Sequence, residues 1–186
     1  ITPVEAQVLR EAAADLAFDD GRKTAGRFAV TVKANDQASP SPELDAVLAK
    51  VGAALAGNTV FRSAARPKAL TRLILSRYRQ GQTYGLHVDD ALMQGIRTDL
   101  SFTLFLSEPA SYDGGALIIE DSFEARAIKL NPGDMILYPS TTLHRVEPVT
   151  RGERLAVVGW AQSLIRRADQ REILFDLDQS IAALRE

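Results

Sequence analysis

The segment over residues 70–162 consists of short apolar stretches separated by glycine, proline and aspartate. Short apolar stretches bounded by turn residues are typical of antiparallel strands. We expect strands over residues 70–78, 100–107, 116–120, 125–130, 134–138, 144–149 and 154–161. A succession of this kind predicts a mostly β chain with flanking α-helices, built around a double-stranded β-helix barrel of the jelly-roll or cupin-like type.

Helical patterns precede this strand region. Thr2, Pro3 and Glu5 predict a helix start, because Thr2 is a suitable N-cap and Glu5 can complete a capping box. The apolar stripe expected for this helix is Val4, Val8, Leu9, Ala12 and Leu16. The alternation over residues 28–33 predicts one further strand.

Two more helices are expected. The first covers residues 42–56, starts at Ser41-Pro42 and stops at Gly57-Asn58, with an apolar face of Leu44, Val47, Leu48, Val51 and Leu55. The second is amphipathic and covers residues 168–185, with apolar positions Ile173, Leu174, Leu177, Ile181 and Leu184. The chain then divides into N-terminal helices and a strand packed on the barrel (1–66), the barrel core (67–165), and a C-terminal helix that begins a truncated helical region (166–186).

Composition excludes several classes of protein. The 186 residues contain no cysteine, which excludes disulfides, zinc-thiolate sites, iron–sulfur clusters and a thiol nucleophile. A net charge of −2 provides no basic field for a phosphate backbone, so we expect no nucleic-acid partner. No apolar run is long enough to span a bilayer and no signal-peptide pattern is present, so we expect no membrane association and a cytoplasmic location.

The only two histidines occur in distinctive surroundings. His87 and Asp89 flank Val88, and alternate residues of an extended segment point the same way, so both side chains can face one metal ion. His144 follows the apolar strand over residues 134–138 and suits a third ligand. Two imidazoles and one carboxylate form the facial triad of non-haem Fe(II) oxygenases, which leaves coordination positions open.

Arg154 follows His144 by ten positions. A dicarboxylate such as 2-oxoglutarate chelates a metal through its 2-oxo and adjacent carboxylate oxygens, and its distal carboxylate then needs a cation. A guanidinium meets that carboxylate with a bidentate fork. The turn over residues 148–152 allows the strand with His144 to fold back into one with Arg154, so both residues can reach one cavity.

These segments resemble the prolyl 4-hydroxylase-type Fe(II)/2-oxoglutarate dioxygenase superfamily. The similar segments are YRQGQTYGLHVD (78–89), RTDLSFTLFL (97–106), DGG (113–115), GD (133–134) and LHRV (143–146). Within the superfamily, YPSTTLHRV (138–146) and PVTRG (148–152) are most similar to the bacterial PKHD-type hydroxylases (PiuC/YbiX-like).

The resemblance implies a double-stranded β-helix core, Fe(II) held by His87, Asp89 and His144, and 2-oxoglutarate held by Arg154. It also implies hydroxylation of a small-molecule or peptide substrate by O2, coupled to decarboxylation of 2-oxoglutarate to succinate, with ascorbate as the reductant that keeps iron ferrous. Members of this bacterial group are associated with iron uptake and siderophore metabolism, which names no substrate.

The sequence departs from the family pattern at two positions. Asp90 stands where the most similar members often have asparagine, and strand alternation favours Asp89 over Asp90 as the ligand. Ala156 replaces a serine or threonine that some members use beside the arginine, so the hydroxyl of Tyr78 is the candidate that contacts the distal carboxylate instead.

Three alternatives stay open at this stage. A 2-oxoglutarate-independent cupin enzyme would leave Arg154 without a role, and a nucleic-acid demethylase is disfavoured by the acidic balance. A non-catalytic iron-sensing or iron-binding cupin-like protein would bind metal without turnover. Trp160 and Gln162 are candidates for the pocket mouth. The primary substrate and homo-oligomer formation also stay open.

Overall fold

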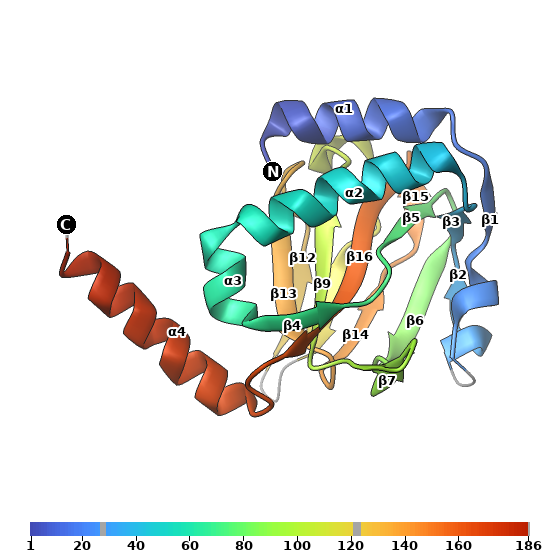
Figure 1. Cartoon of the computed structure of the whole chain (residues 1–186). Helices are drawn as coiled ribbons and strands as arrows, with labels where there is room; N and C mark the ends of the chain where they lie inside the picture. The colour runs from blue at the N-terminus through green and yellow to red at the C-terminus, as the bar shows by residue number, and fades with distance from the viewer. Residues whose placement is uncertain (27–28, 121–123, 186) are drawn as a thin grey trace.

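Two β-sheets face each other and form the body of the protein (Figure 1). The computed structural model describes residues 1–26, 29–120 and 124–185. The larger sheet has the strand order β1-β3-β5-β16-β9-β13, and β4 also pairs with β16. The bounds in that order are Phe18–Asp20, Asp36–Ala38, Ile74–Tyr78, Arg154–Ser163, Leu100–Phe105, Met135–Pro139 and, for β4, Pro67–Leu70.

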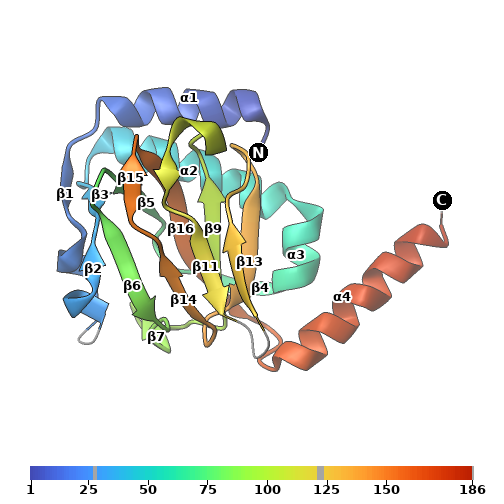
Figure 2. The same cartoon turned by 180° about the vertical axis from the view of Figure 1, so that it is seen from behind.

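The smaller sheet has the strand order β12-β11-β14-β6-β2 and lies across the barrel from the larger one (Figure 2). Two further two-stranded sheets are formed by β7 with β8 and by β10 with β15. The strands of the smaller sheet and of the two pairs are β2 (Lys33–Ala34), β6 (Thr83–His87), β7 (Leu92–Met93), β8 (Ile96–Arg97), β10 (Asp113–Gly114), β11 (Leu117–Glu120), β12 (Ala125–Ile128), β14 (Leu143–Val146) and β15 (Val149–Arg151). Each strand predicted within residues 70–162 overlaps an observed strand.

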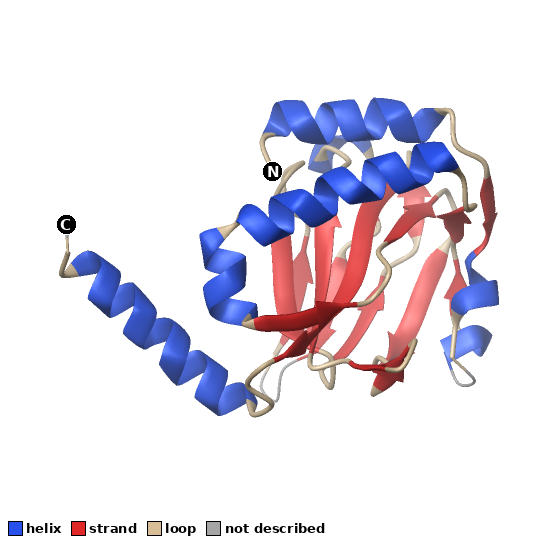
Figure 3. Cartoon of the chain, viewed as in Figure 1, coloured by secondary structure: helices blue, strands red, loops and turns tan. Residues whose placement is uncertain are grey.

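Helices α1 (Pro3–Ala14) and α2 (Pro42–Gly57) lie side by side on the outer face of the larger sheet (Figure 3). The capping box predicted for α1 is confirmed, since Thr2 Oγ1 accepts from the Glu5 amide at 3.2 Å and Glu5 Oε2 accepts from the Thr2 amide at 2.8 Å. The apolar stripe predicted for α1 is confirmed only in part, because Leu9 is buried and Leu16 packs against the main core, whereas Val4 and Val8 are exposed. The buried face is Ala6, Leu9 and Ala13.

The face predicted for α2 is confirmed, and all five of its apolar residues are buried: Leu44, Val47, Leu48, Val51 and Leu55. Asn58 ends α2 and at the same time caps α3 (Thr59–Ala65), because its side-chain oxygen accepts from the Phe61 amide at 2.8 Å. The main hydrophobic core lies between these helices and the larger sheet. A smaller apolar cluster lies between the two sheets.

The strand predicted over residues 28–33 is wrong. Phe28 lies outside the described residues, Ala29–Thr31 forms a 3₁₀-helix, and β2 contains only Lys33–Ala34. The chain turns there to approach β6, where the Gly85 amide donates to the Val32 carbonyl at 2.8 Å. A Cβ on Gly85 would lie 2.8 Å from Val32 Cβ, so glycine permits this close approach.

Helix α4 (Ala168–Ala183) projects from the barrel (Figure 2). It is attached near α3, where Asp178 accepts hydrogen bonds from Arg66 at 2.7 Å and from Ser63 at 2.6 Å. Most apolar positions predicted for it are exposed: Ile173, Leu177, Ile181 and Leu184. The predicted helix is therefore confirmed, while its apolar side faces outwards.

No single helix in the described ranges is long and apolar enough to cross a membrane. Only α2 and α3 taken together reach that length and composition, and they are bent by 77° at their junction. The apolar residues of α2 pack in the main core.

Candidate metal centre and cosubstrate pocket

His87, Asp89 and His144 come together at one end of the smaller sheet. His87 ends β6 and faces His144 of β14 as its antiparallel partner, while Asp89 follows two residues after β6. One ligand atom from each of the three side chains lies within 4.8 Å of the others. His144 Nε2 is 3.7 Å from Asp89 Oδ2. The spacing argument thus predicted a real juxtaposition of two imidazoles and one carboxylate.

Backbone carbonyls orient both imidazoles. His87 Nδ1 lies 2.8 Å from the Gly85 carbonyl oxygen, and His144 Nδ1 lies 2.9 Å from the Thr142 carbonyl oxygen. A carbonyl only accepts, so each Nδ1 carries the proton and donates it. Each Nε2 therefore keeps its lone pair, which is the arrangement that metal-binding histidines commonly show.

Asp89 is held by two serines, Ser101 and Ser140, that no motif or spacing in the sequence singles out. Its Oδ2 accepts from the Ser101 hydroxyl at 2.5 Å, and that hydroxyl is also hydrogen-bonded to the Ser140 hydroxyl at 2.8 Å. The Asp89 amide donates to the Ser140 carbonyl at 3.2 Å. Ser101 lies on β9 of the larger sheet, so the carboxylate is fixed from the opposite wall of the barrel.

The surroundings of His87 favour its neutral form. Burial lowers the pKa of His87 below its ordinary 6.5, and the neighbouring His144 lowers it further. The Tyr84 ring stacks on the His87 ring with a centroid distance of 3.7 Å and an angle of 16°. A neutral imidazole is the form that binds metal, so the site is ready for a cation at neutral pH.

Arg154 is a buried cation without a counter-ion. It begins β16, opposite Tyr78 of β5, and is 1% exposed. Its guanidinium carbon lies 5.3 Å from the Tyr78 ring centroid and 5.1 Å from that of Phe105. Among the described residues, its Nε has no hydrogen-bond partner and no carboxylate forms an ion pair with it. Because an unpaired buried charge is costly, this arrangement suits a carboxylate that arrives with a ligand.

Local backbone geometry delivers Arg154 to this position. Gly152 lies between β15 and β16 with a φ of +76°, and a Cβ there would lie 2.2 Å from the Ser111 carbonyl oxygen. The turn needs glycine at this point. Tyr78 is buried beside Arg154, and burial raises the pKa of its hydroxyl, so the hydroxyl stays protonated and can donate.

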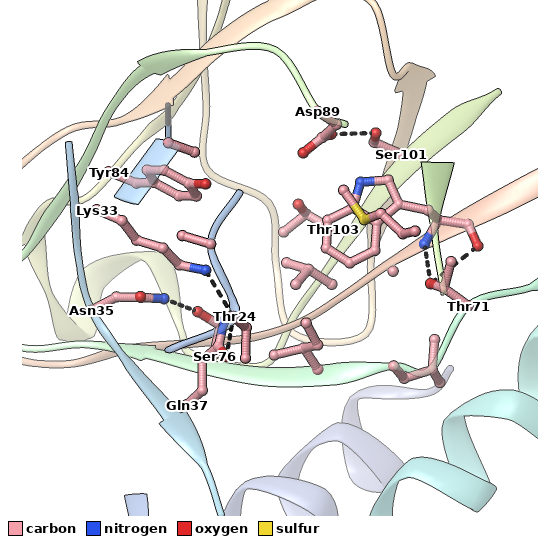
Figure 4. A pocket seen from close by; sticks show the side chains of 18 of the residues that line it. Thr24, Lys33, Asn35, Gln37, Thr71, Ser76, Tyr84, Asp89, Ser101 and Thr103 are labelled. Atoms are coloured by element: carbon pink, nitrogen blue, oxygen red, sulfur yellow. Dashed lines mark hydrogen bonds between the residues drawn. The ribbon is translucent and has the colours of Figure 1, made fainter. Parts of the chain in front are cut away.

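One cavity of about 450 Å³ is lined by all five residues that were predicted to hold iron or 2-oxoglutarate, and Figure 4 shows Asp89 at its wall. They are His87, Asp89, His144, Arg154 and Tyr78. Trp160 also lines this cavity, as expected, whereas Gln162 does not line it, so that expectation is wrong. Asp90 is exposed and is not part of the three-residue ligand cluster, in agreement with the alternation argument.

The donor set fits ferrous iron. Two neutral imidazoles and one carboxylate on one side of a point are the protein ligands of non-haem Fe(II) oxygenases, and the cavity in front of them leaves space for further ligands. The unpaired Arg154 guanidinium in the same cavity adds the cation that a chelating dicarboxylate requires.

Comparison with known proteins supports the same assignment. The model of the 2OG-Fe(II) oxygenase superfamily matches residues 73–162. A PKHD-type hydroxylase of Maricaulis maris is 54% identical over 176 residues, which cover 95% of this chain and 80% of the relative. A PKHD-type hydroxylase of Parvibaculum lavamentivorans is 55% identical over 161 residues, which cover 87% of this chain and 74% of the relative.

Solved structures show the same fold at lower identity. A prolyl-4-hydroxylase of Pseudomonas putida has a TM-score of 0.62 at 19% identity, with 88% of each chain covered. HygX of Streptomyces hygroscopicus, solved with nickel and 2-oxoglutarate bound, has a TM-score of 0.61 at 13% identity and covers 89% of this chain and 81% of its own. The predicted double-stranded β-helix fold is confirmed. This chain belongs to the PKHD-type hydroxylases and is an Fe(II)- and 2-oxoglutarate-dependent dioxygenase.

Proposed function

We propose that His87, Asp89 and His144 hold the iron of this dioxygenase, and that Arg154 anchors the distal carboxylate of 2-oxoglutarate with help from the Tyr78 hydroxyl. The observation that carries the proposal is the buried, unpaired Arg154 guanidinium in the same cavity as the three converging ligands. A non-catalytic iron-binding protein would retain this costly cation without a purpose.

The reaction follows from the chemistry that the bound groups supply. Iron held by His87, Asp89 and His144, with 2-oxoglutarate held by Arg154, would supply the activation of O2, in which one oxygen atom is added to the substrate and the other enters succinate with loss of carbon dioxide. As a carboxylate ligand, Asp89 would take up the coordination position that a halide needs, which favours hydroxylation over halogenation. Ascorbate serves as the reductant that keeps the iron ferrous.

The protein's own residues perform positioning and exclusion of water. Gly85 and Thr142 fix the two imidazole rings, and Ser101 fixes the Asp89 carboxylate. Tyr78 and Phe105 keep water away from the Arg154 guanidinium, which strengthens its attraction for a carboxylate. The cosubstrate is thereby oriented before the substrate enters.

We further propose a small-molecule or peptide substrate and a link to iron uptake or siderophore metabolism, which the family membership supports. A cytoplasmic location agrees with the need for ferrous iron and 2-oxoglutarate. Residues 67–165 carry the reaction, residues 1–66 support the barrel, and residues 166–186 are available for a homo-oligomer contact.

Anaerobic absorption spectroscopy tests this proposal. Addition of Fe(II) and then 2-oxoglutarate to the purified protein is expected to give a visible metal-to-ligand charge-transfer band. The band should disappear in His144→Ala and require much more 2-oxoglutarate in Arg154→Ala, whereas the exposed-residue control Arg126→Ala should match the wild type. Iron binding without any band in the wild type would refute the 2-oxoglutarate site.

Release of succinate in air gives the second readout. The wild-type protein is expected to convert 2-oxoglutarate to succinate slowly without substrate and faster with it. Asp89→Ala should abolish this turnover, since the variant lacks the carboxylate ligand. An Asp89→Ala protein with full activity would overturn the ligand assignment.

A further inference from the structure

A second buried cation lines the cavity. Lys33 of β2 is 8% exposed, and its side chain points toward Thr24 on the same side of the pocket as Tyr84 (Figure 4). Lys33 Nζ donates to Thr24 Oγ1 at 3.2 Å and lies 5.1 Å from the Tyr84 ring centroid. No carboxylate among the described residues forms an ion pair with it. An ammonium has three N–H donors, so donors are left for a ligand.

The charge of Lys33 has no carboxylate in direct contact among the described residues. Burial lowers the pKa of Lys33 to about 8, against the opposing influence of the Asp89 and Asp20 carboxylates, so the side chain is mostly charged at neutral pH. Asp20 is itself engaged by Arg22, which donates to both of its carboxylate oxygens. Lys33 is therefore a largely buried cation whose hydrogen-bond partner, Thr24, is neutral, while the Asp89 and Asp20 carboxylates act on it from beyond ion-pair distance.

The position of Lys33 relates it to the reacting centre. Tyr84 lies opposite Lys33 across the β2–β6 pair, and its ring stacks directly on His87. The Tyr84 ring thus contacts both the Lys33 ammonium and one of the proposed iron ligands. Arg154 enters the cavity from β16 of the other sheet, so the two cations approach it from different walls.

Neutral polar groups surround the ammonium. Thr24 Oγ1 donates to Gln37 Oε1 at 2.7 Å, and the side-chain nitrogen Nδ2 of Asn35 donates to Ser76 Oγ at 2.6 Å. The side-chain oxygen of Asn35 is buried and has no partner. These groups all line the same cavity and add hydrogen-bonding capacity beside a single positive charge.

We propose that Lys33 binds a carboxylate of the primary substrate, so that the substrate is a carboxylate-bearing small molecule. This inference rests on the proposed function, in which Arg154 already serves the distal carboxylate of 2-oxoglutarate. One ammonium with neutral partners matches a singly charged carboxylate, whereas a phosphate is usually met by several donors or by arginine. A cavity of about 450 Å³ that must also hold 2-oxoglutarate suits a small molecule.

The test uses the anaerobic protein loaded with Fe(II) and 2-oxoglutarate and titrated in a calorimeter. The probes are two pairs of similar shape in which a neutral carboxamide replaces the charged carboxylate. They are cyclopentanecarboxylate with cyclopentanecarboxamide, and L-valine with L-valinamide. Binding of at least one carboxylate about 10- to 100-fold tighter than its amide is expected, because a hydrogen bond to a charged group is worth that much. Lys33→Met should remove this preference and Lys33→Arg should retain most of it.

Lys23→Met is the matched control, because Lys23 lies next to Thr24 in the 3₁₀-helix Gly21–Thr24 but is exposed and paired with Asp19. It should keep the preference for carboxylate. No preference for either carboxylate in the wild type, or a preference that survives in Lys33→Met, would overturn the proposal.

The charge-transfer band separates this proposal from the proposed function. We expect Lys33→Met to need the same 2-oxoglutarate concentration for the band as the wild type. A large increase, like that expected for Arg154→Ala, would assign Lys33 to the cosubstrate and refute the substrate role. Absence of the band from the wild type would refute the dioxygenase site itself, and the inference about Lys33 with it.

Discussion

Replacement of Arg154 by methionine should have opposite effects on stability and on cosubstrate binding. Arg154 is 1% exposed, its Nε has no partner, and no described carboxylate balances its charge. A buried uncompensated ion costs several kcal/mol even after the protein relaxes. Methionine has a similar length and adapts to irregular gaps, so it can fill the space without a charge.

The expected increase in the free energy of unfolding of Arg154→Met follows from two opposing contributions. Loss of the contacts with the Tyr78 and Phe105 rings costs about 1–2 kcal/mol each, as for desolvated cation–π contacts. Removal of the buried charge eliminates a desolvation cost that is larger than this loss of ring contacts, so the free energy of unfolding should rise by about 1–3 kcal/mol. For a chain of this length each kcal/mol raises Tm by about 2–4 °C.

Thermal denaturation with and without ligand measures both effects. Arg154→Met without ligand should melt at a higher temperature than the wild type. With Mn(II) and 2-oxoglutarate at about a hundred times Kd, the wild type should gain about 2.7 kcal/mol beyond Mn(II) alone, and the variant should gain almost nothing.

Arg171→Met is the matched control. Arg171 is also buried, but its Nη1 donates to the Ile165 and Arg166 carbonyls at 2.9 Å each. Its replacement leaves two carbonyls unsatisfied and should lower Tm. If Arg154→Met also melts well below the wild type, the guanidinium has a structural role. The argument that its charge is paired only when a ligand carboxylate binds then fails.

Three further predictions concern the site and the core. Ser101→Ala should weaken Mn(II) binding about 10- to 100-fold in calorimetry, because Asp89 loses its orienting hydrogen bond. Ser111→Ala, on a surface turn, should leave the Mn(II) affinity unchanged. If Ser101→Ala binds Mn(II) as tightly as the wild type, Ser101 is dispensable for the site. Leu104→Ala should lower the unfolding free energy in urea by about 2–5 kcal/mol, and a loss below 1 kcal/mol would contradict the packing described for the main core. The metal-free protein should lose stability as pH falls below about 6.5, because the unfolded chain then protonates His87 before the folded protein does. His87→Gln should show a shallower acid dependence, and an unchanged one would assign the effect to other groups.

The features that depend on local pattern were predictable from the sequence. The face of α2 follows from apolar spacing, the start of α1 follows from its capping residues, and His87 and Asp89 share a direction through strand alternation. The ten-residue interval from His144 to Arg154 needs only one reversal of the chain, and Gly152 marks where it occurs. The resemblance and the spacing led to the same four residues, His87, Asp89, His144 and Arg154, and Tyr78 was added from the comparison with the family pattern.

The features that depend on which strands become neighbours were not predictable. Ser101 supports Asp89 from the opposite sheet, and Lys33 reaches the cavity from a two-residue strand, so no spacing rule connects either with the ligands. The buried side of α1 also depends on how α1 and α2 lie together, since two of its three buried residues are alanines, which carry little apolar signal. Residues 29–31 alternate in sequence like a strand, but their approach to Gly85 requires a turn.

The pairing of His87 with His144 across β6 and β14 has a consequence for how the barrel assembles. The two residues are far apart in the chain yet directly opposite in the ladder. A slip by one residue would turn one imidazole to the other face of the sheet. A metal site that includes both rings can therefore form only when the strands pair in the native alignment. Refolding in the presence of metal should favour that alignment. The measured metal affinity then shows whether β6 and β14 have paired correctly.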